Sequence, residues 1–138
     1  MTDDALLAAY CRTRFCADTP RGRIVIRVGE RHPELDAILR AAGCGTWAYI
    51  RAFNPGSVRL SDAENDARQR ELGDALRQLG HPMFPGEGIG DDETWPPEPS
   101  VLVLGIEREV SVQLGRRFGQ RAIVCGQHGG SATLELCA

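Results

Sequence analysis

The sequence of 138 residues contains no lysine, and all 16 of its basic residues are arginine. The absence of lysine excludes Schiff-base chemistry, a phosphate-binding P-loop and a lysine general base. Arginine keeps its charge and presents a rigid set of hydrogen-bond donors, so it suits the binding of carboxylates and other anions better than proton transfer. We therefore expect the basic side chains to bind or to form ion pairs rather than to catalyse.

An excess of positive charge and long apolar runs are also missing. The formal net charge of −3 at pH 7 gives no electrostatic reason to expect a nucleic-acid partner. No apolar run approaches the roughly 20 residues that a membrane-spanning helix needs. The first residues carry acids where a secretory signal carries bases, so we expect a cytoplasmic location and no membrane partner. The sequence indicates no oligomeric state.

Cysteine and histidine occur, but not in the patterns that metal or redox chemistry requires. The cysteines are odd in number and form no C-x-x-C pair: Cys11, Cys16, Cys44, Cys125 and Cys137. Most stand in apolar surroundings, which is typical of small buried hydrophobic residues. The three histidines form no zinc motif, and G-E-G-I-G at 86–90 does not join a strand to a helix. We expect no metal and no cofactor, and whether the protein is an enzyme stays open.

The composition is that of an ordinary globular protein, with 42% apolar and 25% charged residues, and the length fits a single domain over residues 1–138. Hydrophobic periodicity predicts helices at 3–15, 33–42, 61–79 and 107–118, strands at 23–28, 46–53, 100–106, 121–125 and 131–136, a weak strand at 81–84 and a long loop at 85–99. This alternation predicts an α/β (or α+β) fold, in which about four helices flank a mixed β-sheet that ends in an antiparallel hairpin.

The helix expected at 61–79 carries the strongest local signals in the chain. Ser61 and Glu64 have the spacing of a capping box. The apolar stripe of this helix continues toward its start as Asn65 and Arg68, which are polar. Buried polar side chains must be paired, or they cost several kcal/mol, on the order of 2–7. Two interpretations of this polar section remain open.

In the first interpretation, the stripe opens into a polar pocket where the strand at 46–53 ends and the helix begins. Free backbone amides and the helix dipole attract anions at such a place. The candidate ligand-binding residues are Asn54, Ser57, Asn65, Arg68, Glu98 and Gln120, with Glu98 as a candidate partner for Arg68. The expected ligand is small and anionic, such as a nucleotide or a carboxylated metabolite.

In the second interpretation, the same polar residues form a structural latch that braces neighbouring loops. The protein is then a non-enzymatic protein–protein interaction module. Its contact surface would be the proline-rich loop around Trp95.

Four short blocks of the sequence together resemble a bacterial family known only as domain of unknown function number 3293. The blocks are A-F-N-P-G-S (52–57), L-S-D-A-E-N-D-A-R (60–68), W-P-P-E-P-S (95–100) and R-R-F-G-Q-R-A-I-V (116–124). They span roughly residues 46–124 and contain the polar positions that the helix pattern singles out. The resemblance implies a small, stand-alone bacterial protein, and it implies no particular activity.

Overall fold

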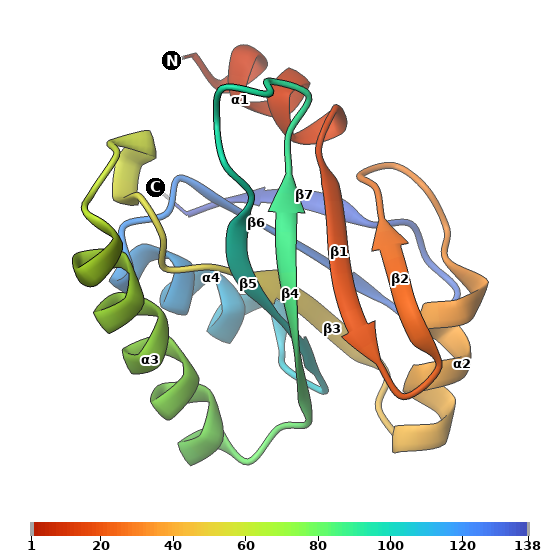
Figure 1. Cartoon of the computed structure of the whole chain (residues 1–138). Helices are drawn as coiled ribbons and strands as arrows, with labels where there is room; N and C mark the ends of the chain where they lie inside the picture. The colour runs from red at the N-terminus through yellow and green to blue at the C-terminus, as the bar shows by residue number, and fades with distance from the viewer. Residues whose placement is uncertain (1, 138) are drawn as a thin grey trace.

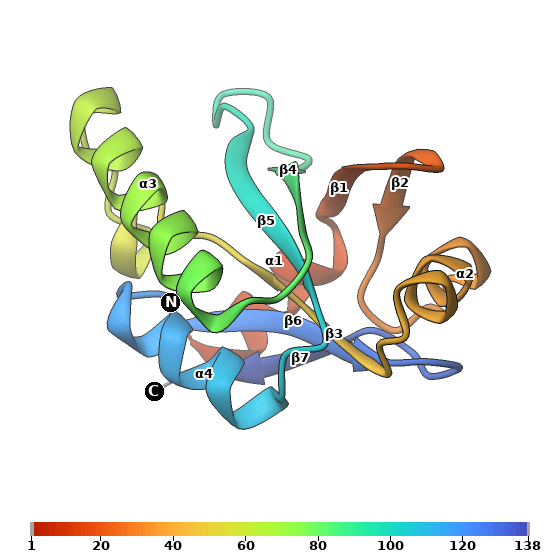
Figure 2. The ribbon, with the colours of Figure 1, turned by 90° about the horizontal axis from the view of Figure 1, so that it is seen from below.

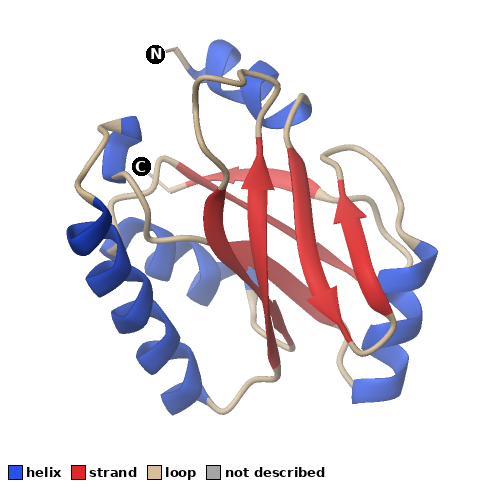
Figure 3. Cartoon of the chain, in the orientation of Figure 1, coloured by secondary structure: helices blue, strands red, loops and turns tan. Residues whose placement is uncertain are grey.

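A computed structural model describes residues 2–137, apart from the side chain of Ser57. In this part of the chain, seven strands form one strongly twisted sheet in the order β2-β1-β4-β5-β3-β6-β7, and four helices cover it (Figures 1 and 3). The elements are α1 (Asp3–Cys11), β1 (Arg14–Thr19), β2 (Gly22–Ile26), α2 (Pro33–Ala42), β3 (Thr46–Ile50), a short 3₁₀ turn (Pro55–Ser57), α3 (Asp62–Leu79), β4 (Met83–Ile89), β5 (Glu98–Leu104), α4 (Arg108–Arg117), β6 (Ala122–Gln127) and β7 (Thr133–Leu136).

The predicted fold class is confirmed, including the flanking helices and the C-terminal hairpin of β6 and β7. One detail differs: each strand pairing in the described sheet is antiparallel, so the sheet is not mixed. The helical connections α3 and α4 do join strands that run parallel, as the alternating pattern predicts. An antiparallel strand lies between the two strands in each case, β5 between β3 and β4, and β3 between β5 and β6.

The two faces of the sheet are covered by different helices (Figure 2). On β3, Trp47 and Tyr49 pack in the core beneath α1 and α2, whereas Ala48 and Ile50 pack against α3 and α4. Large and small side chains therefore alternate along β3, because successive residues of a strand point to opposite faces of the sheet. No helix among residues 2–137 combines the length and the apolar character needed to cross a membrane.

The sequence patterns do not predict two of the strands, β1 and most of β4. The sequence of β4, M-F-P-G-E-G-I, contains a proline and two glycines, which are unfavourable inside a strand. It is nevertheless a strand because β1 pairs with one edge and β5 with the other. A side chain at Gly86 would place its Cβ only 2.1 Å from the backbone oxygen of Cys16, so the close approach of β1 requires glycine there.

Candidate functional site

A buried ion pair lies where β3 ends beside the beginning of β5. The antiparallel register sets Ile50 opposite Val101 and therefore brings the next residue, Arg51, level with Ser100. Glu98, the first residue of β5, lies two residues from Ser100 on the same face of the strand, within reach of the Arg51 side chain. Nη1 of Arg51 lies 3.0 Å from Oε1 of Glu98, and Glu98 is only 5% exposed. A charged pair at this depth is costly to break, because either partner alone would leave an uncompensated charge.

The guanidinium group of Arg51 is fixed by two further contacts. Its Nε donates to Oε1 of Gln120 at 3.1 Å, and its Nη2 donates to the hydroxyl of Tyr10 at 3.1 Å. Burial by itself lowers the pKa of Arg51, but the interactions with Tyr10, Glu98 and Tyr49 outweigh burial, and the pKa is raised. Arg51 is therefore a permanent cation, and 24% of its side chain is exposed.

Glu98 accepts hydrogen bonds from two other residues besides its ion pair. Nδ2 of Asn54 lies 2.5 Å from Oε2 of Glu98, and the indole Nε1 of Trp95 donates to the same oxygen at 3.0 Å. Both carboxylate oxygens are thus paired, which offsets the cost of removing this charge from water. Through Arg51, Asn54 and Trp95, Glu98 connects the end of β3, the turn after β3 and the loop before β5.

Asn54 ties the turn after β3 to the first turns of α3. Its φ angle of 47° is the only positive one among the described residues other than glycine. Its backbone N–H donates to Oδ1 of Asn65 at 2.9 Å, and Nδ2 of Asn65 donates back to Oδ1 of Asn54 at 2.8 Å. The same Oδ1 accepts from the backbone of Leu60. The predicted capping box of Ser61 and Glu64 is confirmed beside them.

Arg68 contacts backbone rather than Glu98. Its Nε donates to the carbonyl of Ala52 at 2.8 Å, and its Nη2 donates to the carbonyl of Phe118. The predicted pairing of Arg68 with Glu98 is therefore wrong. The reason is geometric: Arg51 and Glu98 lie on the face of the sheet that α1 covers, whereas α3, which carries Arg68, packs on the opposite face.

The structure brings most of the predicted site residues into one hydrogen-bonded network. Gln120 completes it, since its Nε2 donates to the carbonyls of Phe53 and Phe118 while its Oε1 accepts from Arg51. The predicted residues in the network are Asn54, Asn65, Arg68, Glu98 and Gln120. Ser57 lies in the turn Pro55–Ser57, and its side chain is outside what the structure describes. No buried side-chain nitrogen or oxygen in the described chain lacks a partner.

A cavity of about 380 Å³ lies beside this network, between α1 and the loop that joins β4 to β5. Figure 1 shows this loop arching beside α1 at the top of the molecule. Arg51, Asn54 and Glu98 form the polar wall of the cavity, and Tyr10 and Trp95 add aromatic surface. We call it the α1 cavity. Sequence reasoning missed Arg51 and Tyr10. The one available signal was a cation on the aromatic face of β3, two residues after Tyr49.

Charged residues also surround the mouth of the α1 cavity. Arg12, just after α1, pairs with Asp91 of the β4–β5 loop at 3.0 Å, and both side chains are more than half exposed. An exposed pair of this kind contributes little to stability, about 0–1 kcal/mol. Asp92 accepts hydrogen bonds from the hydroxyl and the backbone N–H of Thr94, which lower the pKa of its carboxyl group.

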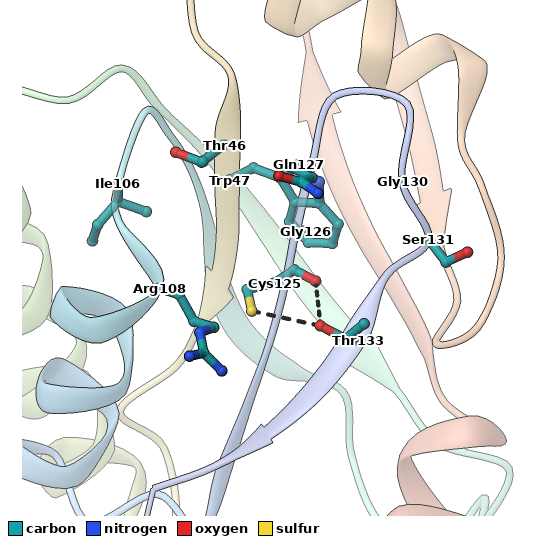
Figure 4. A pocket seen from close by; sticks show the side chains of 10 residues that line it. All are labelled: Thr46, Trp47, Ile106, Arg108, Cys125, Gly126, Gln127, Gly130, Ser131 and Thr133. Carbon is teal, nitrogen blue, oxygen red and sulfur yellow. Dashed lines mark hydrogen bonds between the residues drawn. The ribbon is translucent and has the colours of Figure 1, made fainter.

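A second cavity, of about 460 Å³, opens between the β6–β7 hairpin and the beginning of α4 (Figure 4). The hydroxyl of Thr133 donates to the carbonyl of Cys125 at 3.2 Å, and Arg108 lies at the edge, where it pairs with Glu135. The second cavity is lined by Thr46, Trp47, Ile106, Arg108, Cys125, Gly126, Gln127, Gly130, Ser131 and Thr133. Its one charged side chain, Arg108, is 60% exposed, so it offers a weaker electrostatic site than the α1 cavity.

The five cysteines are all free thiols, and three of them, Cys16, Cys125 and Cys137, are buried. Burial raises the pKa of Cys125 and raises that of Cys137 to about 11. Both thiols are therefore protonated at neutral pH and poor nucleophiles. Among residues 2–137, no group of three or more histidine, cysteine, aspartate or glutamate side chains could hold a metal ion.

Thiol reactivity is expected to separate exposed Cys11 from the two buried thiols with raised pKa. At pH 8, a disulfide reagent should modify Cys11 readily and leave Cys125 and Cys137 unmodified until the protein unfolds. The folded pKa of Cys137 lies above its unfolded value, so its contribution to stability is complete below about pH 9 and is lost as the pH rises toward 11. Peptide mapping after timed labelling measures the order in which the thiols react, and rapid labelling of Cys137 in the folded protein would contradict the expected order.

The comparisons with known proteins give one match. No curated protein and no solved structure matches the chain. The family model described as a protein of unknown function (DUF3293) matches residues 50–123, which is more than half of the sequence. The matched stretch includes Arg51, Asn54, Trp95 and Glu98, whereas most of the lining of the second cavity lies outside it. The resemblance carried by the four sequence blocks is thus confirmed, and the chain belongs to the DUF3293 family.

Proposed function

We propose that this protein binds a small organic anion in the α1 cavity and that Arg51 holds the anionic group. The observation that carries this proposal is that the Arg51 guanidinium in the cavity wall has N–H donors that its protein contacts do not use. An arginine side chain has five N–H donors. The described contacts of Arg51 with Glu98, Gln120 and Tyr10 use three of them, so two remain for a ligand.

The fixed position of Arg51 supports binding. Its three partners come from β5, from the segment after α4 and from α1, so the guanidinium group is oriented before any ligand arrives. A group that is already ordered loses less conformational entropy on binding than a free surface arginine does. The planar guanidinium also matches the two oxygens of a carboxylate or phosphate group.

The rest of the α1 cavity suits the body of an organic molecule. Leu6, Tyr10, Phe15 and Trp95 supply apolar and aromatic lining around the polar wall. A volume of about 380 Å³ lies within the range of small-molecule sites, roughly 300–1,000 Å³. The class of ligand expected from the sequence, a nucleotide or a carboxylated metabolite, is carried into this proposal.

The proposed site lies beside α1 and shares Asn54 and Glu98 with the set predicted from the sequence. The start of α3 is a less favourable anion site than its sequence suggests, because the side chains of Ser61 and Glu64 already cap it. The other predicted residues contact the polar wall indirectly. Asn65 holds Asn54, and Gln120 holds Arg51. Arg68 holds the carbonyl of Ala52, just after β3.

Binding is proposed rather than catalysis because of the residues in the lining. No histidine, cysteine or serine lines the α1 cavity, and the hydroxyl of Thr13 donates to the carbonyl of Ala9. The alternative, an interaction module with the Trp95 loop as contact surface, is supported by the 37% exposure of Trp95. Since Trp95 also forms part of the cavity wall, its replacement would affect both functions. A substitution on α1 that fills the cavity distinguishes the two functions, because it leaves Trp95 in place.

Substitution of Ala9 by tryptophan is expected to abolish ligand binding, because Ala9 lines the cavity and the indole would occupy it. The matched control is Ala8→Trp, which places the same side chain on an exposed position of the same helix. Thermal shift against monocarboxylates, dicarboxylates, phosphate monoesters and nucleotides measures binding. A ligand at 100 times its Kd stabilises the folded protein by about 2.7 kcal/mol. The proposal fails if no compound with a carboxylate or phosphate group stabilises the wild-type protein, or if both variants bind equally.

A further inference from the structure

The charges that line the α1 cavity do not sum to a positive site. The lining holds two arginines and three acids: Arg12, Arg51, Asp91, Asp92 and Glu98. Four of these form two ion pairs, Arg12 with Asp91 and Arg51 with Glu98, each at 3.0 Å. Asp92 has no cationic partner among the described residues, so the lining carries one excess negative charge.

Asp92 is held in place with one oxygen free. Its Oδ1 accepts from the backbone N–H of Thr94 at 2.9 Å and from the Thr94 hydroxyl at 2.6 Å. Its Oδ2 has no partner in the described part of the chain. The two hydrogen bonds lower the pKa of Asp92, so it is ionised at neutral pH and its free oxygen can accept from a cation.

These two features, a fixed cation and a separate free carboxylate, favour a ligand that carries both signs of charge. A ligand with negative charge alone gains at Arg51 but is repelled by Asp92, and a nucleotide with several negative charges is repelled most. An ammonium group on the ligand converts this repulsion into an attraction. The aromatic lining then receives the apolar part of the molecule.

We propose that the ligand is a zwitterionic amino carboxylate: its carboxylate binds the free N–H groups of Arg51, its ammonium group faces Asp92, and its apolar part lies among Tyr10, Phe15 and Trp95. This rests on the proposed function, in which Arg51 holds an anionic group, and it narrows the ligand class to molecules that carry an ammonium group besides their carboxylate. It disfavours nucleotides as the natural ligand.

The test compares each common amino acid that binds with the deaminated acid of the same carbon skeleton, by isothermal titration calorimetry on the full chain. The amino acid is expected to bind about three- to five-fold more tightly, a modest ratio because Asp92 is exposed to solvent. Asp92→Asn keeps an acceptor for Thr94 and is expected to bring the two affinities together. Glu93→Gln, an exposed neighbour outside the lining, is the control and should keep the full ratio.

The outcomes distinguish this inference from the proposed function. If deaminated acids or nucleotides bind as tightly as amino acids, and Ala9→Trp abolishes their binding, the site exists and the zwitterion inference is wrong. The inference is also wrong if Asp92→Asn and Glu93→Gln leave the same ratio. If neither amino acids nor any organic anion binds, the proposed function itself fails.

Discussion

Replacement of Glu98 by alanine is expected to lower the free energy of unfolding by about 3–5 kcal/mol, as is typical when one partner of a buried ion pair is removed. The variant leaves the Arg51 cation without its carboxylate. It also leaves the indole N–H of Trp95 and the side-chain amide of Asn54 without their acceptor. Equilibrium denaturation in urea, with the slope m compared between variants, measures the loss.

Two further variants show whether the loss comes from the buried pair. Glu93→Ala removes an exposed carboxylate from the same segment and should change stability by no more than about 0.5 kcal/mol. Adding Arg51→Met to Glu98→Ala should recover part of the loss, because the uncompensated charge is then gone. A loss of less than about 1 kcal/mol for Glu98→Ala would mean that the pair is solvated, as exposed pairs are.

Local signals in the sequence were sufficient to predict α3 and the polar residues around its start. The capping box, the apolar stripe and the break in that stripe at Asn65 and Arg68 are all encoded within one helix. A polar residue on an apolar stripe must find a partner, so the stripe predicts a polar network without showing its geometry. The network of Asn54, Asn65 and Glu98 is therefore the part of the site that sequence reasoning reached.

The choice of partners and the place of the cavity depend on long-range pairing, which no local pattern encodes. Arg51 meets Glu98 because β3 pairs with β5, strands that a helix and a further strand separate in the sequence. The cavity depends on β4, which the pattern assigns mostly to a loop because of Pro85, Gly86 and Gly88. Pairing with strands on both edges overrides the low strand propensity of these residues.

Replacement of Asn54 by alanine is expected to lower the free energy of unfolding by about 2–4 kcal/mol, since each buried polar group left without a partner costs about 1–3 kcal/mol. The variant removes the acceptor for the backbone of Leu60 and for the amide of Asn65, and the donor to Glu98. It also places alanine at a φ of 47°, where a side chain without local hydrogen bonds is strained.

The variant Asn54→Gly separates the two contributions. Glycine loses the same side-chain hydrogen bonds but adopts the positive φ without strain, so we expect it to be about 1 kcal/mol more stable than Asn54→Ala. The effects of Asn54→Ala and Glu98→Ala should not add, because both remove the hydrogen bond between these side chains. If the two losses add fully in a double-mutant cycle, or if alanine at position 54 is as stable as asparagine, this network does not hold the end of β3 against α3 and β5. The wall that positions Arg51 would then lack the support on which the proposed binding site depends.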